Sequence, residues 1–269
     1  MASLRELVAT GRTIAVPGAT DALSARLIEA HGFDCAYIGS YATAASRFAV
    51  PDTGLLSLDA LVEQARTIAR SVKIPVIADA EGGFNEPAAM GRTVQAFERA
   101  GVAAIHIEDH TGAGKHTCAP QTLRSLADTA ARIRAAVAAR RNPDFLIVAR
   151  SDAFWISRDL DGCIVRLEAY AAAGADMIFP TAVGPAELAE LRRRIDKPIM
   201  IVDMPGRTLE EHAGASIVLY YAFSTLVQFE ALSSALRAFK SGKHPEGQAE
   251  LETFLMSYLN GRGSSEPGR

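Results

Sequence analysis

The sequence predicts an α/β fold: a closed (β/α)8 barrel of the TIM type, followed by one additional helix. Short apolar segments rich in Ile and Val recur eight times, and the segments between them have apolar residues at helical spacing. The short segments lack strict alternation of polar and apolar residues, which is expected of strands buried on both faces. A chain of 269 residues with 49% hydrophobic content is long enough for one such barrel. An open doubly wound sheet is the alternative.

The first four strands are predicted from apolar runs that end at Gly, Pro or charged residues. They are Thr13–Val16, Ala36–Gly39, the run that begins at Pro75, and Ala103–Ile107. Apolar residues at helical spacing predict the helices between them, with Pro87 suited to a first turn. These helices are Ser3–Thr10, Asp21–His31, Ser57–Val72, Pro87–Ala100 and Thr122–Arg140. A long polar loop is expected between the second strand and Asp52.

The last four strands are predicted in the same way, each with a helix before it. They are Phe145–Ala149, Met177–Pro180, Ile199–Val202 and Ile217–Tyr220. A helix is predicted from about Asp161 to Ala173, and Gly174 and Gly214 are turn residues of the kind that end helices. Eight β/α units therefore fill residues 1–240.

A further helix is predicted after the barrel, over Glu246–Leu259. Its apolar stripe consists of Leu251, Phe254, Leu255 and Tyr258. A helix left over after barrel closure needs another surface to bury this stripe, so we expect a homo-oligomer, a dimer or a tetramer. Residues 241–260 thus form an oligomerisation segment, and the polar residues 261–269 form a flexible tail.

Composition excludes several classes of partner. The net charge is −3 and the charged residues are interspersed, so no basic stripe for nucleic acid is expected. No uncharged apolar run is long enough to span a membrane, and the N-terminus lacks the order of a signal peptide. The cysteines Cys35, Cys118 and Cys163 are odd in number and widely spaced, which favours a reducing compartment. We expect a cytoplasmic protein that acts on a small molecule.

Polar residues concentrate where the predicted strands end. In a barrel these carboxyl ends meet on one face, where functional groups gather. They supply Ser40, Tyr41, Asp79, Glu81, Glu108, Asp109, His110, Arg150, Asp152, Thr181 and Asp203. Asp79, Glu81 and Glu108 offer only oxygen ligands, which predicts a Mg²⁺ or Mn²⁺ site. Arg150, on the next strand, is placed to bind a carboxylate or phosphonate of the substrate.

Simpler interpretations of these residues stay open. The acidic pair Asp79 and Glu81 could cap the next helix, and Arg150 could form an internal salt bridge with Asp152 or Asp79. The segment from His110 to Cys118 contains two glycines and several proton donors, which suits a flexible lid. Its Gly-Lys pair lacks the spacing of a nucleotide-binding loop. Several aromatic residues are expected in the core or at an interface, namely Trp155, Tyr220, Tyr221, Phe223 and Phe229.

Six motifs follow one another along the chain, namely Tyr37-Ile-Gly-Ser40, Pro51-Asp52-Thr-Gly-Leu-Leu, Asp79-Ala-Glu81-Gly-Gly-Phe, Ile107-Glu108-Asp109, Ala149-Arg150-Ser-Asp152 and Gly174-Ala-Asp-Met-Ile-Phe-Pro180. Their order and their placement at successive strand ends resemble the isocitrate lyase/phosphoenolpyruvate mutase superfamily between about Val16 and Phe229. The resemblance implies a Mg²⁺-dependent barrel whose last helix is exchanged between subunits. It also implies cleavage or formation of a C–C or C–P bond next to an enolpyruvate-like or succinate-like carbanion.

The resemblance assigns roles to individual residues. It implies that Asp79, Glu81 and Glu108 organise the metal and that Arg150 binds the substrate anion. Residues at the end of the second strand would hold substrate oxygens, namely Tyr37, Gly39 and Ser40. Asp52 matches an aspartate near the reacting centre. A divalent cation and a guanidinium would together lower the energy of the enolate left by bond cleavage.

Departures from the superfamily pattern bear on the choice of reaction. Lyases of the superfamily usually carry Lys-Lys/Arg-Cys-Gly-His on a mobile loop, whereas this chain has Lys115, His116, Thr117 and Cys118 followed by Ala. Either Thr117 occupies the cysteine position or a longer loop brings Cys118 there as proton donor. Thr181 and Asp203 also differ from the residues that those lyases carry after strands six and seven. We therefore expect a C–C lyase or decarboxylase, with a C–P mutase or hydrolase and a catalytically silent barrel as alternatives.

Overall fold

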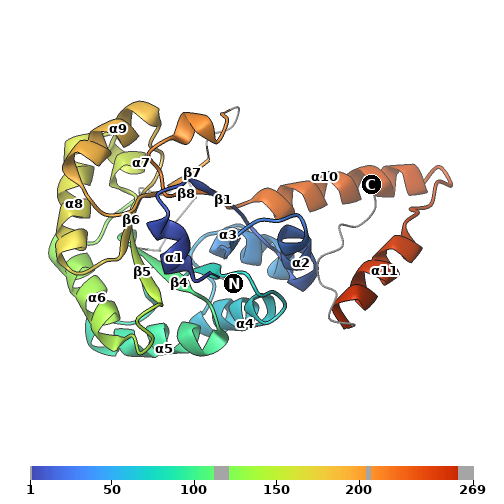
Figure 1. The fold of residues 1–269 in the computed structure, drawn as a ribbon, viewed down its shortest axis with the longest axis horizontal. Helices are drawn as coiled ribbons and strands as arrows, with labels where there is room; N and C mark the ends of the chain where they lie inside the picture. The colour runs from blue at the N-terminus through green and yellow to red at the C-terminus, as the bar shows by residue number, and fades with distance from the viewer. Residues whose placement is uncertain (1, 112–120, 204–206, 260–269) are drawn as a thin grey trace.

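In the part of the chain that the structure describes, eight parallel strands form the centre, and helices surround them (Figure 1). The computed structural model describes residues 2–111, 121–203 and 207–259. The strands are β1 Ile14–Pro17, β2 Ala36–Ile38, β3 Val76–Asp79, β4 Ala104–Glu108, β5 Leu146–Ser151, β6 Met177–Pro180, β7 Met200–Val202 and β8 Ile217–Tyr220. All eight lie within two residues of the strands predicted from sequence.

The strands close into a barrel. One ladder runs from β2 to β6 in sequence order, and the second has the order β1-β8-β7. A parallel bridge between Gly18 and Tyr37 joins β1 to β2, and another between Ile178 and Ile199 joins β6 to β7. The (β/α)8 prediction is confirmed, and the open doubly wound sheet is excluded because β1 pairs with β8.

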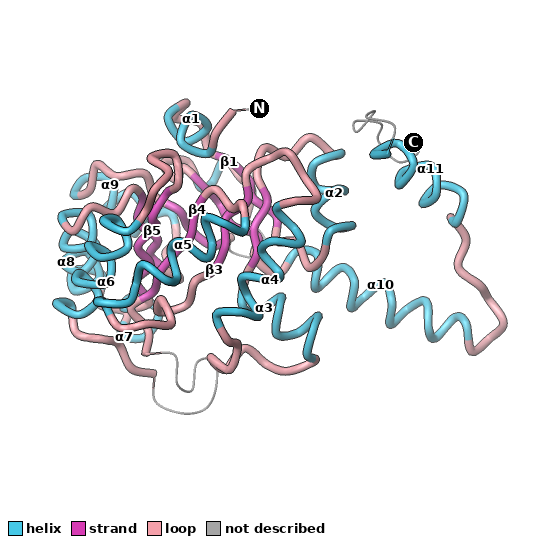
Figure 2. The backbone as a smooth tube through the Cα atoms, turned by 90° about the horizontal axis from the view of Figure 1, so that it is seen from below, coloured by secondary structure: helices cyan, strands magenta, loops and turns pink. Residues whose placement is uncertain are grey.

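Helices cover the outside of the barrel (Figure 2). They are α1 Leu4–Ala9, α2 Ala22–Ala30, α3 Ser40–Thr43, α4 Leu58–Ala69, α5 Met90–Ala100, α6 Leu126–Ala139, α7 Ala153–Ser157, α8 Leu160–Ala172, α9 Pro185–Arg194, α10 Phe223–Phe239 and α11 Gln248–Leu259. Polar side chains start several of them: Ser57 accepts a hydrogen bond from the Ala60 N–H, and Asp159 accepts one from Gly162. The apolar stripes predicted from sequence face the strands, since the buried residues of α4 include Leu61, Ala65 and Ile68.

Two groups of buried side chains make the core. The larger lies between the strands and the surrounding helices, and the smaller fills the barrel interior. Leu4 and Leu7 of α1 belong to the interior group, together with Ile77, Val148 and Met200. The leading helix therefore packs at the end of the barrel where the strands begin, and the opposite end is left for a functional site.

The connections differ from the sequence prediction in four places. The segment predicted as a polar loop contains α3 and a π-helical turn, Ala44–Phe48. The short helix α7 after β5 was not predicted, and α6 begins at Leu126 instead of Thr122. Within the described residues, the connection from β7 to β8 contains only a 3-10 turn, Glu210–His212, where a helix was predicted. Apolar spacing does not reveal such short elements because they bury few side chains.

The last two helices extend away from the barrel (Figure 1). α11 turns back toward α2, where the Tyr258 hydroxyl donates to the Arg26 carbonyl at 3.1 Å and the Arg26 guanidinium lies 4.4 Å from the Tyr258 ring. The intervening α10 exposes many apolar side chains, namely Phe223, Leu226, Val227, Phe229, Leu232, Leu236 and Phe239. Among the described residues, no helix has the length and apolar character needed to cross a membrane.

Candidate active site

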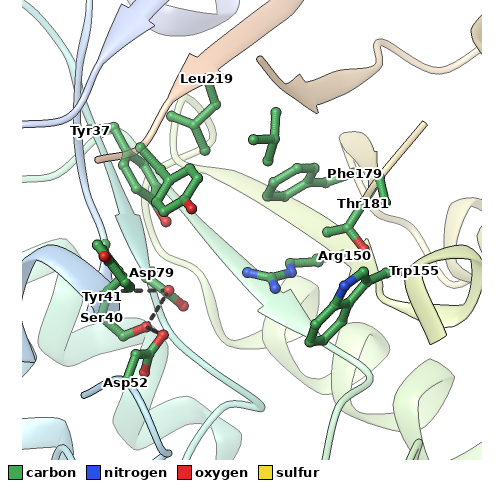
Figure 3. Close-up of a pocket in the computed structure, with 14 residues that line it drawn as sticks. Tyr37, Ser40, Tyr41, Asp52, Asp79, Arg150, Trp155, Phe179, Thr181 and Leu219 are labelled. Carbon is green, nitrogen blue, oxygen red and sulfur yellow. Dashed lines mark hydrogen bonds between the residues drawn. The ribbon is translucent and has the colours of Figure 1, made fainter. Parts of the chain in front are cut away.

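A cavity of about 210 Å³ opens at the carboxyl ends of the strands (Figure 3). Its described lining comes from the ends of β2, β3, β5, β6, β7 and β8 and from the segments after them, so residues far apart in sequence meet around it. The lining residues are Tyr37, Gly39, Ser40, Tyr41, Asp52, Asp79, Arg150, Trp155, Phe179, Thr181, Ala182, Val202, Leu219 and Tyr221. Seven of these were predicted as site residues: Tyr37, Gly39, Ser40, Asp52, Asp79, Arg150 and Thr181.

Asp79 and Glu81 come together through a turn. Asp79 is the last residue of β3, and Glu81 lies beyond the strand with a left-handed φ of 48°. The Glu81 N–H donates to Asp79 Oδ1 at 2.8 Å, and the Glu108 N–H donates to the Glu81 carbonyl at 2.9 Å. The two acids therefore meet through this turn and not through a continuation of β3.

Gly83 completes this turn. Its φ is 91°, and a Cβ there would lie 2.4 Å from Cε of the fully buried Met90. A larger residue would meet both backbone strain and a collision. The Gly-Gly pair that follows Glu81 thus allows the chain to turn tightly over α5.

Three buried carboxylates fit a divalent cation. Asp79, Glu81 and Glu108 each offer an oxygen within 4.8 Å of the others. Oxygens on opposite sides of an octahedral Mg²⁺ ion lie roughly 4.2 Å apart, since each is about 2.1 Å from the ion. Bound directly or through water, Mg²⁺ or Mn²⁺ suits this set of oxygen donors.

Ser40 links two of the acids that face the cavity. Its hydroxyl lies 2.9 Å from Asp79 Oδ2 and 3.1 Å from Asp52 Oδ2, and its N–H donates to Asp79 at 3.3 Å (Figure 3). The N–H is available because Ser40 is the first residue of α3, where backbone donors lack helical acceptors. The helix that sequence reasoning missed thus fixes Asp79 and Asp52 relative to each other.

Arg150 faces these acids across the cavity (Figure 3). Its Nε and Nη2 donate to the two oxygens of Asp152 at 2.8 and 3.1 Å, and its Nη1 lies 3.2 Å from Glu108 Oε2. Burial alone would lower the pKa of Arg150, but Asp152 and Glu108 raise it well above the usual value. The guanidinium is thus a permanent cation in a fixed orientation. The predicted internal pair with Asp152 exists, and Arg150 nevertheless lines the cavity.

Tyr37 and His106 stack inside the barrel. The Tyr37 hydroxyl lies 2.9 Å from His106 Nε2, and the ring centroids are 5.8 Å apart at 11°. Burial raises the pKa of Tyr37 well above its usual value, and Asp79 adds to this effect. The phenol therefore keeps its proton at neutral pH and presents a hydroxyl group beside the acids.

The chain that forms this site matches a known protein family. The profile of a family described as phosphoenolpyruvate phosphomutase matches residues 4–240. The chain belongs to the phosphoenolpyruvate mutase/isocitrate lyase superfamily. This confirms the resemblance predicted from the strand-end motifs, and the superfamily contains both carbon–carbon lyases and C–P mutases.

Relatives in this superfamily act on different small acids. 2,3-Dimethylmalate lyase of Eubacterium barkeri is 35% identical over 259 residues, 89% of this chain and 86% of that protein. A probable 2-methylisocitrate lyase of Corynebacterium glutamicum is 36% identical over 243 residues, 86% of this chain and 79% of that protein. The solved structure of phosphonopyruvate hydrolase in complex with oxalate and Mg²⁺ has a TM-score of 0.85 at 26% identity, covering 96% and 95% of the two chains.

The remaining predicted site residues are Thr181, Asp203 and four residues of the loop after β4. The Thr181 hydroxyl donates to Asp152 at 3.0 Å, so it supports the partner of Arg150. Asp203 is not among the described lining residues, and its Oδ1 lies 3.2 Å from Nε2 of the buried His212. The predicted loop residues Lys115, His116, Thr117 and Cys118 lie outside the described residues. Their roles remain predictions.

Sequence reasoning missed a buried network around Asp109. This carboxylate accepts hydrogen bonds from the Ser151 hydroxyl at 2.7 Å, the Asp152 N–H at 2.9 Å and the Tyr170 hydroxyl at 3.0 Å. Arg166 of α8 lies 3.4 Å away. Asp109 thereby connects β4, β5 and α8 and fixes the peptide of Asp152. In the sequence, the only sign of a role for Asp109 was its position directly after Glu108.

Two aromatic residues also have a different place from the one predicted. Trp155 and Tyr221, interpreted from sequence as core or interface residues, line the cavity. Trp155 lies beside Arg150 because α7 directly follows β5 (Figure 3). The missed helix is what brings this side chain to the site.

Proposed function

We propose that this protein is a Mg²⁺- or Mn²⁺-dependent lyase that cleaves a carbon–carbon bond, by lyase or decarboxylase chemistry, in a small 2-oxo or 2-hydroxy di- or tricarboxylic acid. The observation that carries the proposal is the Arg150 guanidinium, which faces Asp79 and Ser40 across one cavity. An anionic substrate would lie between a fixed cation and the acidic triad. Similarity to 2,3-dimethylmalate lyase and 2-methylisocitrate lyase supports the choice of a C–C bond.

The proposed metal site consists of Asp79, Glu81 and Glu108. A divalent cation held there would act as a Lewis acid and stabilise negative charge on substrate oxygens. Arg150 would bind a substrate carboxylate and stabilise the same charge as the bond breaks. Its orientation is set in advance by Asp152, so little reorganisation is needed during the reaction.

In this proposal, residues other than the metal ligands and Arg150 transfer the protons. Asp52, which is buried and bonded to Ser40, would accept the hydroxyl proton of the substrate. Tyr37, Gly39 and Ser40 would orient the substrate oxygens. The proton that quenches the carbanion would come from one of Lys115, His116, Thr117 and Cys118, or from Tyr37.

A substrate screen tests the proposal. Oxaloacetate, phosphonopyruvate, methylisocitrate and alkylmalates are incubated with the protein and Mg²⁺, and oxo acids and phosphate are measured together. We expect an oxo acid without phosphate from one of the carbon acids, loss of turnover on adding EDTA, and recovery with excess Mg²⁺. Turnover that survives complete chelation contradicts the metal dependence. A catalytically silent barrel predicts that no compound is cleaved.

A C–P reaction on phosphonopyruvate or phosphoenolpyruvate is the second candidate. It is favoured by the match to the phosphoenolpyruvate phosphomutase profile and by the similarity to phosphonopyruvate hydrolase. Release of inorganic phosphate from phosphonopyruvate in the same screen, with no cleavage of the carbon acids, decides for a hydrolase. Interconversion of the two phosphorus compounds decides for a mutase.

We also propose that the protein is a homo-oligomer, a dimer or a tetramer, built through residues 241–260. The exposed apolar side chains Leu251, Leu255 and Met256 of α11 support this, and those of the neighbouring α10 add to them, because exposed apolar patches commonly mark contacts between proteins. Exchange of α11 between subunits is part of the proposal, although in this chain α11 contacts its own α2. Light scattering that gives a monomer mass at all concentrations would contradict it. A cytoplasmic location remains a prediction from the sequence.

A further inference from the structure

A second, smaller cavity lies next to the acidic triad. Its volume is about 160 Å³, far more than the roughly 15 Å³ that one buried water needs. Among the described residues it shares no lining residue with the cavity at Arg150, because Asp79 lines that cavity and Glu81 lines the second one. The residues that decide its chemistry are Glu81, Gly82, Phe84, Thr111, Arg124 and Arg132. A ligand here would lie beside the proposed metal site without entering the cavity at Arg150.

The backbone of Arg124 is fixed beside this cavity. Its N–H donates to the Asp109 carbonyl at 2.8 Å, and its own carbonyl accepts a hydrogen bond from Arg166 at 3.1 Å. The Thr111 N–H donates to the Thr122 carbonyl at 3.1 Å, so the segments before Thr111 and after Thr122 pair antiparallel. This pairing brings Arg124 to the turn that follows β3.

The Arg124 guanidinium has few partners in the part of the chain that the structure describes. Its Nη1 lies 3.8 Å from Asp128, which is too far for a hydrogen bond, and its buried Nε has no acceptor among the described residues. Nε and Nη2 lie against Gly82, where a Cβ would be 3.3 Å from each of them. The side chain stays 26% exposed, so its Nη groups can be reached from the cavity. A charged donor left in this state is costly unless a ligand or water accepts from it.

The other arginine of the cavity differs from Arg124. Arg132 is 2% exposed, and it donates to two carboxylates and to two backbone carbonyls. Its charge is thus compensated within the protein. Arg124 is the arginine of this cavity that keeps its charge for a ligand.

The turn after β3 adds two backbone donors. Glu81, Gly83 and Phe84 have left-handed φ values of 48°, 91° and 59°. Turns of this kind gather N–H groups into concavities that bind anions. The N–H groups of Gly82 and Phe84, which both line the cavity, donate to no acceptor among the described residues. Two backbone donors and one guanidinium therefore line the same small cavity.

We propose that the second cavity, at Gly82, Phe84 and Arg124, binds a small oxyanion, a phosphate or a monocarboxylate, and that this anion strengthens metal binding at the acidic triad. Arg124 would donate to the anion through its Nη groups, as guanidinium groups commonly do. This second anion site goes beyond the proposed function. It depends on the metal site and not on which bond the protein cleaves.

The link to the metal follows from charge. The carboxylate of Glu81 lines the cavity and repels an anion, and a divalent cation at the triad would offset this repulsion. Arg124 in turn repels a divalent cation, and a bound anion would offset that repulsion. The cation and the anion must then strengthen each other's binding by the same factor.

Calorimetric titrations with inorganic phosphate and with acetate test the second anion site. Each anion is added with and without Mg²⁺ at constant ionic strength, and the free Mg²⁺ concentration is corrected for pairing with the anion. Arg124→Gln removes the guanidinium, and Arg134→Gln, at an exposed arginine of α6, is the matched control. Arg124 has only the ion pair at 3.8 Å to lose, so the variant should fold, which its melting temperature checks.

We expect the Mg²⁺-loaded protein to bind at least one of the two anions. Arg124→Gln should weaken this binding about tenfold or more, because a charged hydrogen-bond donor is lost, and Arg134→Gln should leave it unchanged. A saturating anion should lower the dissociation constant of Mg²⁺ about fivefold or more in the original protein and not in Arg124→Gln. Binding of phosphate alone would assign the site to phosphate compounds, and binding of acetate alone would assign it to carboxylic acids.

Other outcomes contradict the proposal or part of it. Equal anion affinity in Arg124→Gln and the original protein would place the anion at Arg150 and overturn the second site. Absence of binding by both anions would show that water fills the cavity. Anion binding that requires Arg124 but ignores Mg²⁺ would keep the site and overturn its link to the metal. Absence of Mg²⁺ binding under all conditions would contradict the proposed metal site instead.

Discussion

Arg150 and Asp152 form a two-point pair at the end of β5, with N–O distances of 2.8 and 3.1 Å. The guanidinium fork matches the two carboxylate oxygens, which fixes its plane as well as its position. Glu108 contacts the remaining side of the fork at 3.2 Å. Arg150 thus joins the proposed metal site to the proposed anion site.

Arg150→Lys should therefore lower kcat/KM by about 100-fold or more, although the charge is kept, because an ammonium group cannot make the two-point contact. The check is steady-state kinetics on the substrate found in the screen, together with the melting temperature. Arg158→Lys, at a residue after α7 that does not line the cavity, is the control. Near-normal activity in Arg150→Lys would show that the charge alone suffices.

Asp79→Asn should remove most of the affinity for Mg²⁺ and Mn²⁺, since one of three carboxylates becomes neutral. The side chain keeps its shape, so Ser40 retains a partner and the fold should stay near native. Calorimetric titration with each ion measures the loss, expected to be at least as large as the roughly 10- to 100-fold caused by losing an outer-shell partner of a metal ligand. Asp59→Asn, an exposed acid on α4, should bind the ions like the original protein. Unchanged ion affinity in Asp79→Asn would overturn the metal assignment.

Asp109→Asn should raise KM more than it lowers kcat. Asp109 holds the Asp152 N–H, and Asp152 holds Arg150, so the substitution loosens the anion-binding group through its support. A purely structural role would lower the melting temperature and leave KM of the folded protein unchanged. Kinetics and thermal unfolding on the same samples distinguish the two cases. Tyr170→Phe removes one hydrogen bond to Asp109 and should give a smaller change in KM.

Cys163 should be inert to alkylation at pH 8 in the folded protein. Burial raises the pKa of its thiol from 9.0 to about 11, so the thiolate is scarce at this pH. The folded state keeps this proton while the unfolded state releases it above pH 9. The stability associated with the neutral thiol is thus present below pH 9 and lost as the pH rises toward 11.

Urea unfolding of the original protein and Cys163→Ala at pH 8 and pH 10.5 measures this effect. Both proteins share all other titrating groups, so the difference between them isolates the thiol. The original protein should lose about 1–2 kcal/mol more than the variant over this interval. Equal losses would show that the pKa of Cys163 is not raised.

Much of the architecture was predictable from local patterns. The eight strands are short apolar runs bounded by turn residues, and their positions agree with the sequence prediction because burial on both faces leaves a continuous apolar signature. Asp79, Glu108 and Arg150 were identified because each ends one of these runs. The short helices α3 and α7 were missed, since four or five residues do not establish a helical period.

The sequence by itself predicted the eight strands, the residues of the acidic triad and the superfamily, because each depends on periodicity or on a motif at the end of one strand. Only the tertiary structure decided which side chains share the cavity. Trp155 reaches it through an unpredicted helix, and Leu219 lines the same cavity as Asp79 although 140 positions separate them. The Asp109 network likewise joins β4, β5 and α8 through hydrogen bonds that no local pattern encodes. Such contacts depend on how the strands close around one axis, and closure is a property of the whole chain.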